Sequence, residues 1–161
     1  MKDLLFKTDD FVFSYRVAGI LIHEGKILLQ TAGDDPGYAF PGGHVAYGET
    51  HQETLEREFQ EEMGLDIQVN ELKWVGEIFF PWGKKPCHQI CLYYLVSAPK
   101  SNALRTLPLV VQDEAGDMNA KLCFHWIDLQ KIPELEIYPT NAKQLLFQLD
   151  QGVQHFVYRE G

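Results

Sequence analysis

Three glutamates crowd the end of one predicted helix, within the stretch REFQEEMG at residues 57–64. Glu58 lies three residues before Glu61 and four before Glu62, so helical geometry stacks their carboxylates on neighbouring turns. Each like-charge pair costs roughly 0.2–0.5 kcal/mol, and negative charge in the last turn also opposes the helix dipole. Arg57 alone does not cancel this repulsion. Because a solvated charged face leaves the cost unexplained, these residue types at this spacing indicate a functional site.

The helix that carries these carboxylates is predicted over residues 50–63. Its apolar residues recur every four positions, at Leu55, Phe59 and Met63, which is typical of an amphipathic helix with one buried face. Gly64 follows and is expected to end the helix in the left-handed conformation. Two further glutamates of this helix are interpreted as part of its solvated face: Glu53 and Glu56.

The rest of the chain is predicted to form mainly strands. They are expected at residues 16–22, 26–30, 66–80 and 88–97, with a turn at 81–83 and two more strands flanking an acidic loop at 113–117. A second helix is predicted within residues 138–152, with Thr140 as its N-cap and Gly152 as its stop. Strands adjacent in sequence, interrupted by helices, predict the α/β class with a mixed sheet covered by helices.

Composition narrows the classes of protein that the chain can belong to. With 161 residues, 45% of them hydrophobic and 12% aromatic, it is expected to form a single domain over residues 1–161. A net charge of −9, with Lys84-Lys85 as the only adjacent basic pair, argues against a groove for long nucleic acids. The N-terminal stretch has no signal-peptide pattern, and no apolar run reaches the length of a membrane span. We therefore expect a cytoplasmic protein that does not bind membranes.

The cysteines predict neither disulfides nor a zinc site. Three is an odd number, which suits a reducing compartment better than a disulfide framework. Cys87, His88 and Cys91 in the segment CHQIC have zinc-binding side chains. However, the segment alternates like a strand, which points His88 away from the two sulfurs.

Residues 43–65 resemble the Nudix box, the signature of a family of hydrolases. Five residues separate Gly43 from Glu49, and seven more separate Glu49 from the run REFQEEMGL that starts at Arg57. The fixed positions of the box are all matched: glycine at 43 and 64, glutamate at 49, 58, 61 and 62, arginine at 57, and apolar residues at 59 and 65. A chance match has an expectation on the order of 10⁻⁶ or lower. The sequence is therefore identified as a member of the Nudix family, which implies an α/β/α sandwich with a mixed β-sheet flanked by helices.

The resemblance implies a hydrolase that uses Mg²⁺ or Mn²⁺. Similar family members let water attack phosphorus in the phosphoanhydride bond of a nucleoside diphosphate linked to another group, so the implied partner is a small nucleotide derivative. Mg²⁺ prefers hard oxygen ligands, and the family pattern assigns it to Glu58, Glu61, Glu62 and the backbone carbonyl of Gly42. A bound cation relieves the repulsion among the crowded carboxylates.

Two further residues of the box receive supporting catalytic roles from the family pattern, beside Glu58 and Glu61. Arg57 is expected to hold the ligand carboxylates in place, and Glu49 to act at the helix start as an orienting or additional carboxylate near the metal. Many relatives carry an acidic residue at the position of Ala46, which this chain lacks. Many also have a carboxylate on a later loop. Glu114 is the first candidate here, beside Asp113 and Asp117, with Glu77 on a strand as a separate candidate; an acidic solvated loop is the alternative interpretation.

The substrate stays open at the level of the sequence. Tyr38, Phe80 and Trp82 are candidates for a wall that stacks on a base, with core packing as the alternative for Phe80. Nucleotide sugars, dinucleoside polyphosphates, CDP-alcohols and damaged nucleoside triphosphates all fit the motif. Two further questions stay open: whether the chain is a nucleotide-binding sensor or regulatory module with little turnover, and whether it forms a homodimer.

Overall fold

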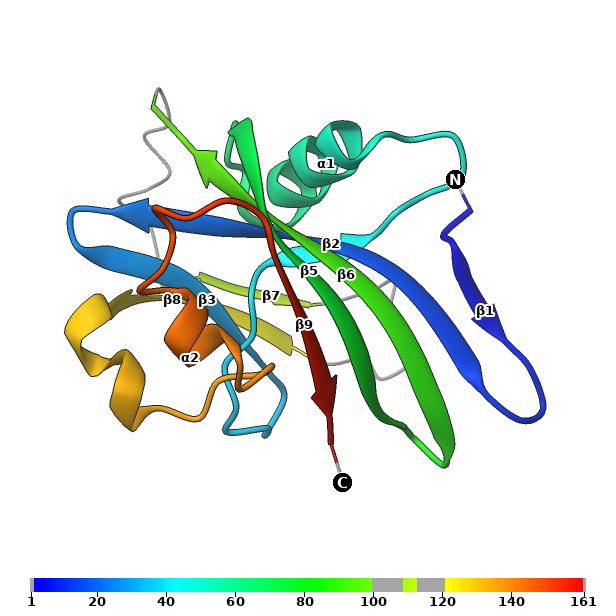
Figure 1. Cartoon of the computed structure of the whole chain (residues 1–161). Helices are drawn as coiled ribbons and strands as arrows, with labels where there is room; N and C mark the ends of the chain where they lie inside the picture. The colour runs from blue at the N-terminus through cyan, green and yellow to red at the C-terminus, as the bar shows by residue number, and fades with distance from the viewer. Residues whose placement is uncertain (1, 100–108, 113–120, 161) are drawn as a thin grey trace.

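The computed structural model describes residues 2–99, 109–112 and 121–160. Its strands are β1 (Leu5–Lys7), β2 (Val12–His23), β3 (Lys26–Ala32), β4 (Gly42–His44), β5 (Gln68–Trp82), β6 (Lys85–Ser97), β7 (Leu109–Gln112), β8 (Lys121–Asp128) and β9 (Gln154–Arg159). Its helices are α1 (His51–Met63), the 3-10 helix η2 (Leu129–Glu134) and α2 (Ala142–Leu145). The strands form one mixed sheet in the order β7-β8-β3-β2-β6-β5-β9, with β1 and β4 also paired with β2 (Figure 1).

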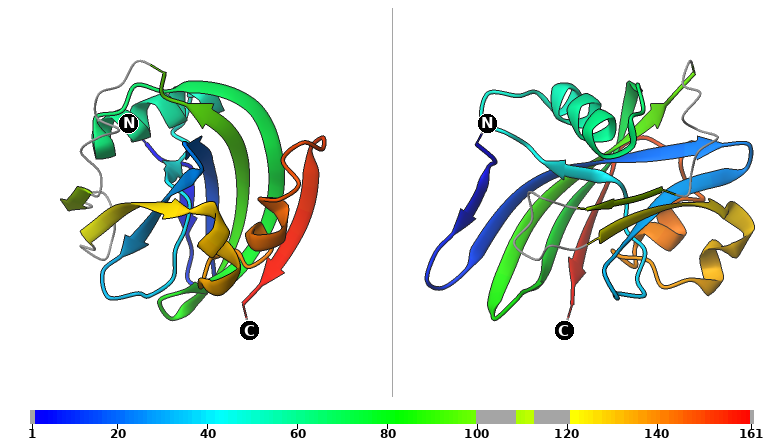
Figure 2. Two further views of the ribbon diagram at one scale, coloured as in Figure 1. Left: turned by 90° about the vertical axis from the view of Figure 1, so that its left-hand side faces the viewer. Right: turned by 180° about the vertical axis from the view of Figure 1, so that it is seen from behind.

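Strand β2 lies at the centre of this sheet and carries core residues on both faces. Val17 and Leu21 pack with the apolar stripe of α1 in one hydrophobic cluster. Ala18 and Ile20 point the other way, into a second cluster that includes buried residues of η2 and α2. Figure 2 shows the strongly curved sheet, with α1 packed on one face and η2 and α2 on the other. The predicted α/β sandwich with a mixed sheet flanked by helices is confirmed.

Helix α1 begins and ends at local signals in the sequence. Thr50 is the N-cap: its side chain accepts a hydrogen bond from the backbone N–H of Glu53, while the Glu53 side chain accepts from the N–H of Thr50. Gly64 ends the helix with φ of 66°. Leu55 and Phe59 are fully buried, as the apolar pattern predicts. Glu53, interpreted as part of a solvated face, is exposed but also completes this capping box.

The prediction of a second helix is wrong in the length of the helix and in its N-cap residue. Within residues 138–152 the structure has only the single turn of α2, whose N-cap is Asn141 and not Thr140. The Asn141 side chain donates to the backbone oxygen of Val157 in β9 instead of capping the helix. The chain leaves the helical path after one turn and then runs alongside β5 as the parallel strand β9, which the sequence analysis does not predict.

The hairpin between β5 and β6 also turns later than predicted. Pro81 and Trp82 are still paired with Pro86 and Lys85, so the turn lies at Gly83 and Lys84 and not at residues 81–83. The tighter hairpin lengthens both strands, and β5 and β6 extend well beyond the end of the sheet that α1 covers (Figure 1).

The side chains of the CHQIC segment alternate between the two faces of the strand, as predicted. Cys87 and Cys91 are buried on β6, whereas His88 is exposed on its opposite face. Within the described ranges, no helix is long and apolar enough to cross a membrane.

Gly42 is expected to be required for the pairing of β4 with β2. A Cβ at this position would lie 2.1 Å from the backbone oxygen of Val17 and 2.7 Å from the Cα of Ala18. Because both neighbours are backbone atoms, Gly42→Ala should lower the free energy of unfolding of the metal-free protein by about 1–3 kcal/mol. Urea denaturation in EDTA measures the loss. Gly152→Ala, where a Cβ meets nothing within 4 Å, is the control and should stay within about 0.5 kcal/mol.

Candidate active site

Arg57 is the centre of the site, because its guanidinium binds three carboxylates at once. Its Nε and Nη2 donate to the two oxygens of Glu49 at 2.8 and 2.9 Å, which is a bidentate pair. Its Nη1 donates to Glu58 at 2.9 Å and to Glu61 at 3.3 Å. The structure therefore gathers three of the glutamates that the box singles out around one guanidinium.

Glu49 is held from several directions at the start of α1. Besides Arg57, the Oγ1 of Thr54 donates to Glu49 Oε1 at 2.9 Å, and the backbone N–H of Ala46 donates to the same oxygen at 3.3 Å. The hydrogen bonds from Arg57, followed by those from Thr54 and Ala46, lower the pKa of Glu49 from 4.5 to about 2 against the opposing effect of burial. Glu49 is thus a fixed anion that orients Arg57.

Glu58 lies directly against the backbone of β4. A Cβ on Gly43 would sit 2.3 Å from Cδ of Glu58 and within 2.6 Å of both its carboxylate oxygens. Only glycine leaves room for the carboxylate at this position. The strand and the helix are therefore brought together at the side chain that the box predicts to bind a metal.

Burial dominates the electrostatics of Glu58. Burial raises its pKa above the ordinary value, hydrogen bonds with Glu62 and Arg57 lower it, and the nearby charge of Glu61 raises it again. Two carboxyl groups, those of Glu58 and Glu62, are therefore close enough to share a hydrogen bond. Crowded hard oxygens of this kind suit Mg²⁺ or Mn²⁺, because these cations prefer carboxylate and carbonyl oxygens.

The predicted ligands do not all converge on one point. The Glu61 side chain is 60% exposed and reaches back toward Arg57. Among the described residues, no group of three acidic, histidine or cysteine side chains has the geometry of a metal site. Arg57 draws Glu58 and Glu61 to itself in this arrangement. The chemistry of the donors fits a hard divalent cation, and Gly42, the predicted carbonyl ligand, is the neighbour of Gly43 on β4.

The structure brings two of the three predicted aromatic residues together on the face of the sheet beside β4. Trp82 lies 6.2 Å from Phe80 and 6.1 Å from His44, measured between ring centroids. The Lys7 ammonium lies 5.6 Å from the Trp82 ring. Tyr38 is elsewhere: its ring packs 5.8 Å from that of His125 in β8.

Sequence reasoning missed a polar network on the same face. Ser14 is buried and donates to Gln89 at 2.9 Å, and the imidazole of His44 lies 3.1 Å from the Ser14 hydroxyl. Arg16 donates to the backbone oxygen of Phe40 at 2.8 Å. The signal in the sequence was the recurrence of polar residues at alternate positions of β2, beginning at Ser14, in a strand that is otherwise apolar.

One predicted site residue cannot be placed. Glu114, the candidate carboxylate outside the box, lies outside the described residues, as does the acidic loop at 113–117.

Comparisons with known proteins agree with this architecture. A family model described as the NUDIX domain matches residues 14–148. A NUDIX hydrolase from Nitrosomonas europaea has a TM-score of 0.60 at 17% identity, covering 91% of this chain and 79% of that chain. A UDP-X diphosphatase has a TM-score of 0.59 at 15% identity, covering 94% of this chain and 68% of that chain. The mutator MutT protein from Bacillus halodurans has a TM-score of 0.57 at 20% identity, covering 91% and 90%.

The chain belongs to the Nudix family, because the family model spans most of its length. The structural neighbours share its fold. The protein is a hydrolase that acts on phosphorus-containing anhydrides, and the family generally uses divalent metal ions. The family assignment made from the box and the assignment as an enzyme are both confirmed.

The bidentate pair of Arg57 and Glu49 makes the free energy of unfolding depend on pH. Because the folded state lowers the pKa of Glu49 from 4.5 to about 2, its contribution is complete above about pH 5 and is lost as the pH falls toward 2. Glu49→Gln should therefore lower the free energy of unfolding by about 3 kcal/mol at pH 7. The difference from wild type should shrink toward pH 2.

Chemical denaturation in EDTA at several pH values measures this dependence. Glu56→Gln is the control on the same helix, because Glu56 is exposed and accepts a hydrogen bond from the exposed Gln52; it should change stability by less than about 0.5 kcal/mol throughout. A difference for Glu49→Gln that stays constant from pH 7 to pH 2 would contradict the role assigned to its charge.

Proposed function

We propose that the protein hydrolyses the phosphoanhydride bond of a nucleoside diphosphate linked to another group, with Mg²⁺ or Mn²⁺ as its cofactor and water attacking phosphorus. The observation that carries this proposal is the approach of Glu58 to the glycine backbone of β4. There a carboxylate of α1 and a strand carbonyl can bind one cation. The UDP-X diphosphatase among the structural neighbours is named for a substrate of this kind.

The residues that would hold the cation are Glu58, Glu61, Glu62 and the backbone carbonyl of Gly42. When bound, the cation neutralises the pyrophosphate and polarises its oxygens as charge develops on the leaving group. Arg57 holds Glu58 and Glu61 in place by hydrogen bonds. It is itself held by Glu49, so the ligands are oriented before substrate arrives.

The face beside β4 supplies the binding site for the nucleoside. Phe80 and Trp82 offer ring faces on which a base can stack. His44 is held at the same face by the buried pair Ser14 and Gln89, so its imidazole is able to orient a polar group of the substrate. Tyr38 lies apart from this wall, on the side of β8, where it packs on His125.

Metal dependence and turnover together test the proposed function. Hydrolysis of a panel of nucleotide derivatives should stop after exhaustive chelation with EDTA and return with Mg²⁺ or Mn²⁺. Chromatography of the products should show a nucleoside monophosphate. A protein that binds nucleotide and metal but releases no monophosphate over hours is a sensor and not this enzyme, and full activity after chelation would remove the metal mechanism.

Helix α1 carries both the predicted metal ligands and a control glutamate, Glu56, which is exposed. Replacing Glu58, Glu61 or Glu62 by Gln keeps the shape of the side chain but removes a charge next to the cation, so kcat should fall roughly 10²–10³-fold for each, as for loss of one preorganised stabilising group. Glu56→Gln should change kcat by less than about threefold. Steady-state kinetics with Mg²⁺ measure the four variants, and equal losses in all of them would show that the assignment of metal-facing carboxylates is wrong.

A further inference from the structure

A row of five side chains crosses the sheet on the face opposite to the proposed nucleoside site. Phe6, Phe13, His88, Phe79 and Arg159 are direct register partners on the adjacent strands β1, β2, β6, β5 and β9. Directly paired residues point to the same face of a sheet. These five residues therefore form a continuous line, here called the aromatic row.

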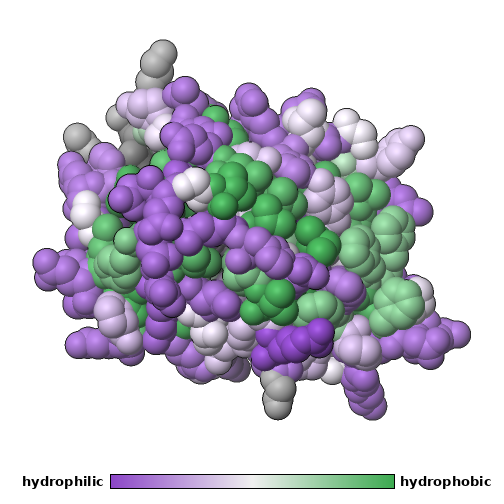
Figure 3. Space-filling model, in the orientation of Figure 1, coloured by the Kyte–Doolittle hydropathy of each residue, from purple (hydrophilic) through white to green (hydrophobic). Residues whose placement is uncertain are grey.

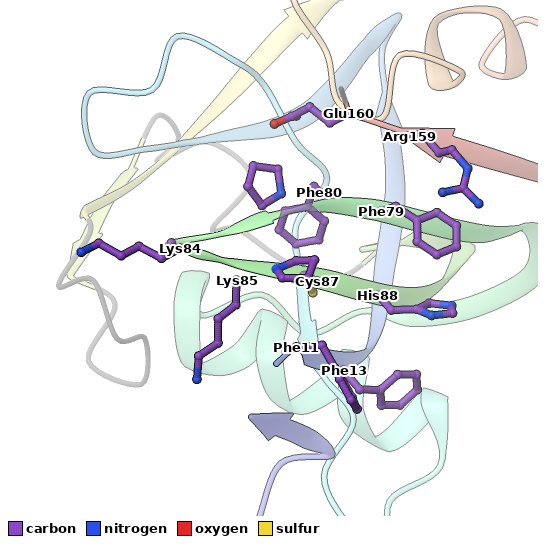
Figure 4. A pocket seen from close by; sticks show the side chains of 13 residues that line it. Phe11, Phe13, Phe79, Phe80, Lys84, Lys85, Cys87, His88, Arg159 and Glu160 are labelled. Atoms are coloured by element: carbon purple, nitrogen blue, oxygen red, sulfur yellow. The ribbon is translucent and has the colours of Figure 1, made fainter. Parts of the chain in front are cut away.

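The members of the aromatic row touch their neighbours along its length. Ring centroids are 6.3 Å apart for Phe6 and Phe13, 6.1 Å for Phe13 and His88, and 4.5 Å for His88 and Phe79. The guanidinium carbon of Arg159 lies 4.2 Å from the centroid of the Phe79 ring, which is a cation–π contact. Figure 4 shows Arg159, Phe79, His88 and Phe13 following one another across the strands.

The aromatic row lies at the end of the sheet that α1 does not cover. Helix α1 packs over Val17 and Leu21, farther along β2, whereas Phe6 is 47% exposed and the neighbouring Phe11 is 46% exposed. His88 is exposed as well. Figure 3 shows hydrophobic side chains gathered on this side of the molecule, over the strands beyond α1.

A cavity of about 840 Å³ lies over this surface. That volume is in the range of small-molecule sites, roughly 300–1,000 Å³. Three cations line it, Lys84, Lys85 and Arg159, against one carboxylate, Glu160. The chain as a whole has a net charge of −9, so the charge of this lining is opposite in sign to that of the whole protein. The lining thus combines exposed aromatic rings with an excess of positive charge.

This cavity is distinct from the carboxylate cluster of the candidate active site. None of the glutamates of the Nudix box lines it. Phe79 and Phe80 are consecutive on β5, so their side chains point to opposite faces. The lining of the cavity also includes Phe80, Cys87 and Lys85 near the tip of the β5–β6 hairpin, but the aromatic row itself faces away from His44 and Trp82.

We propose that the aromatic row, with its own Arg159 and with Lys84 at the hairpin turn, forms a second binding site, which takes a nucleoside phosphate. Aromatic side chains accept any base by stacking, and the exposed ring of His88 with the half-buried ring of Phe13 beside it provides the platform. Lys84, at the turn of the hairpin, is exposed and available to the phosphate. An apolar partner makes no use of the cations, and a simple inorganic anion makes no use of the rings. A ligand that has both a flat ring and negative charge uses both.

The test uses adenosine monophosphate as the probe in EDTA, with the whole chain and amide shifts in two-dimensional NMR as readout. Residues around His88 should shift and saturate. The double variant His88→Ala, Lys84→Ala should weaken this binding at least about tenfold, given the usual contribution of one stacked base. Because both side chains are exposed, its thermal unfolding should match wild type. Adenosine and inorganic phosphate should each bind at least about tenfold more weakly than the monophosphate.

Trp82→Ala is the matched control, since it alters the opposite face and should leave binding at the aromatic row within about twofold of wild type. Shifts confined to the face of Trp82 and His44 would overturn the proposal, as would equal binding by the double variant. Sedimentation velocity supplies a third outcome: a dimer that the double variant abolishes would show that a second copy of the chain, and not a nucleotide, covers the aromatic row.

Discussion

The site depends on the ion pairs of Arg57 with three carboxylates. One guanidinium bridges Glu49, which precedes α1, and Glu58 and Glu61, which belong to it. Because Arg57 offers several donors in a rigid plane, it fixes directions as well as distances. Without a cation at this point, the like charges at the end of α1 would repel one another and oppose the helix dipole.

Close approach of the backbone is the second constraint. Gly42 and Gly43 are adjacent on β4 but are required for different reasons. A Cβ on Gly42 would strike the backbone of β2 at Val17, whereas a Cβ on Gly43 would strike the carboxylate of Glu58. One glycine therefore lets the strand join the sheet, and the other lets the helix carboxylate reach the strand. The site therefore requires both close contacts, that of Gly42 with β2 and that of Gly43 with Glu58.

Strands β2, β6 and β5 serve two surfaces because successive side chains point to opposite faces. On one face Ser14 and Gln89 form a buried hydrogen-bonded pair near His44. On the other, Phe13 and His88 are consecutive members of an aromatic row. A one-residue shift in register would exchange these two sets, so the pairing of β2 with β6 decides which chemistry faces β4.

The sequence by itself determined what depends on short-range geometry. The period of Leu55 and Phe59 and the stop at Gly64 act within a few residues, and both predict α1 correctly. The spacing of the box also places Arg57 beside Glu61, because side chains four positions apart on a helix lie on the same face.

Tertiary structure decided what depends on partners far away in the chain. The short α2 and the strand β9 replaced a longer predicted helix, since Asn141 bonds to β9 and β9 pairs with β5. The contact of Ser14 with Gln89 and the aromatic row likewise follow from the parallel pairing of β2 with β6. Alternation in a sequence shows that a strand has two faces, but it does not show which strand lies beside it.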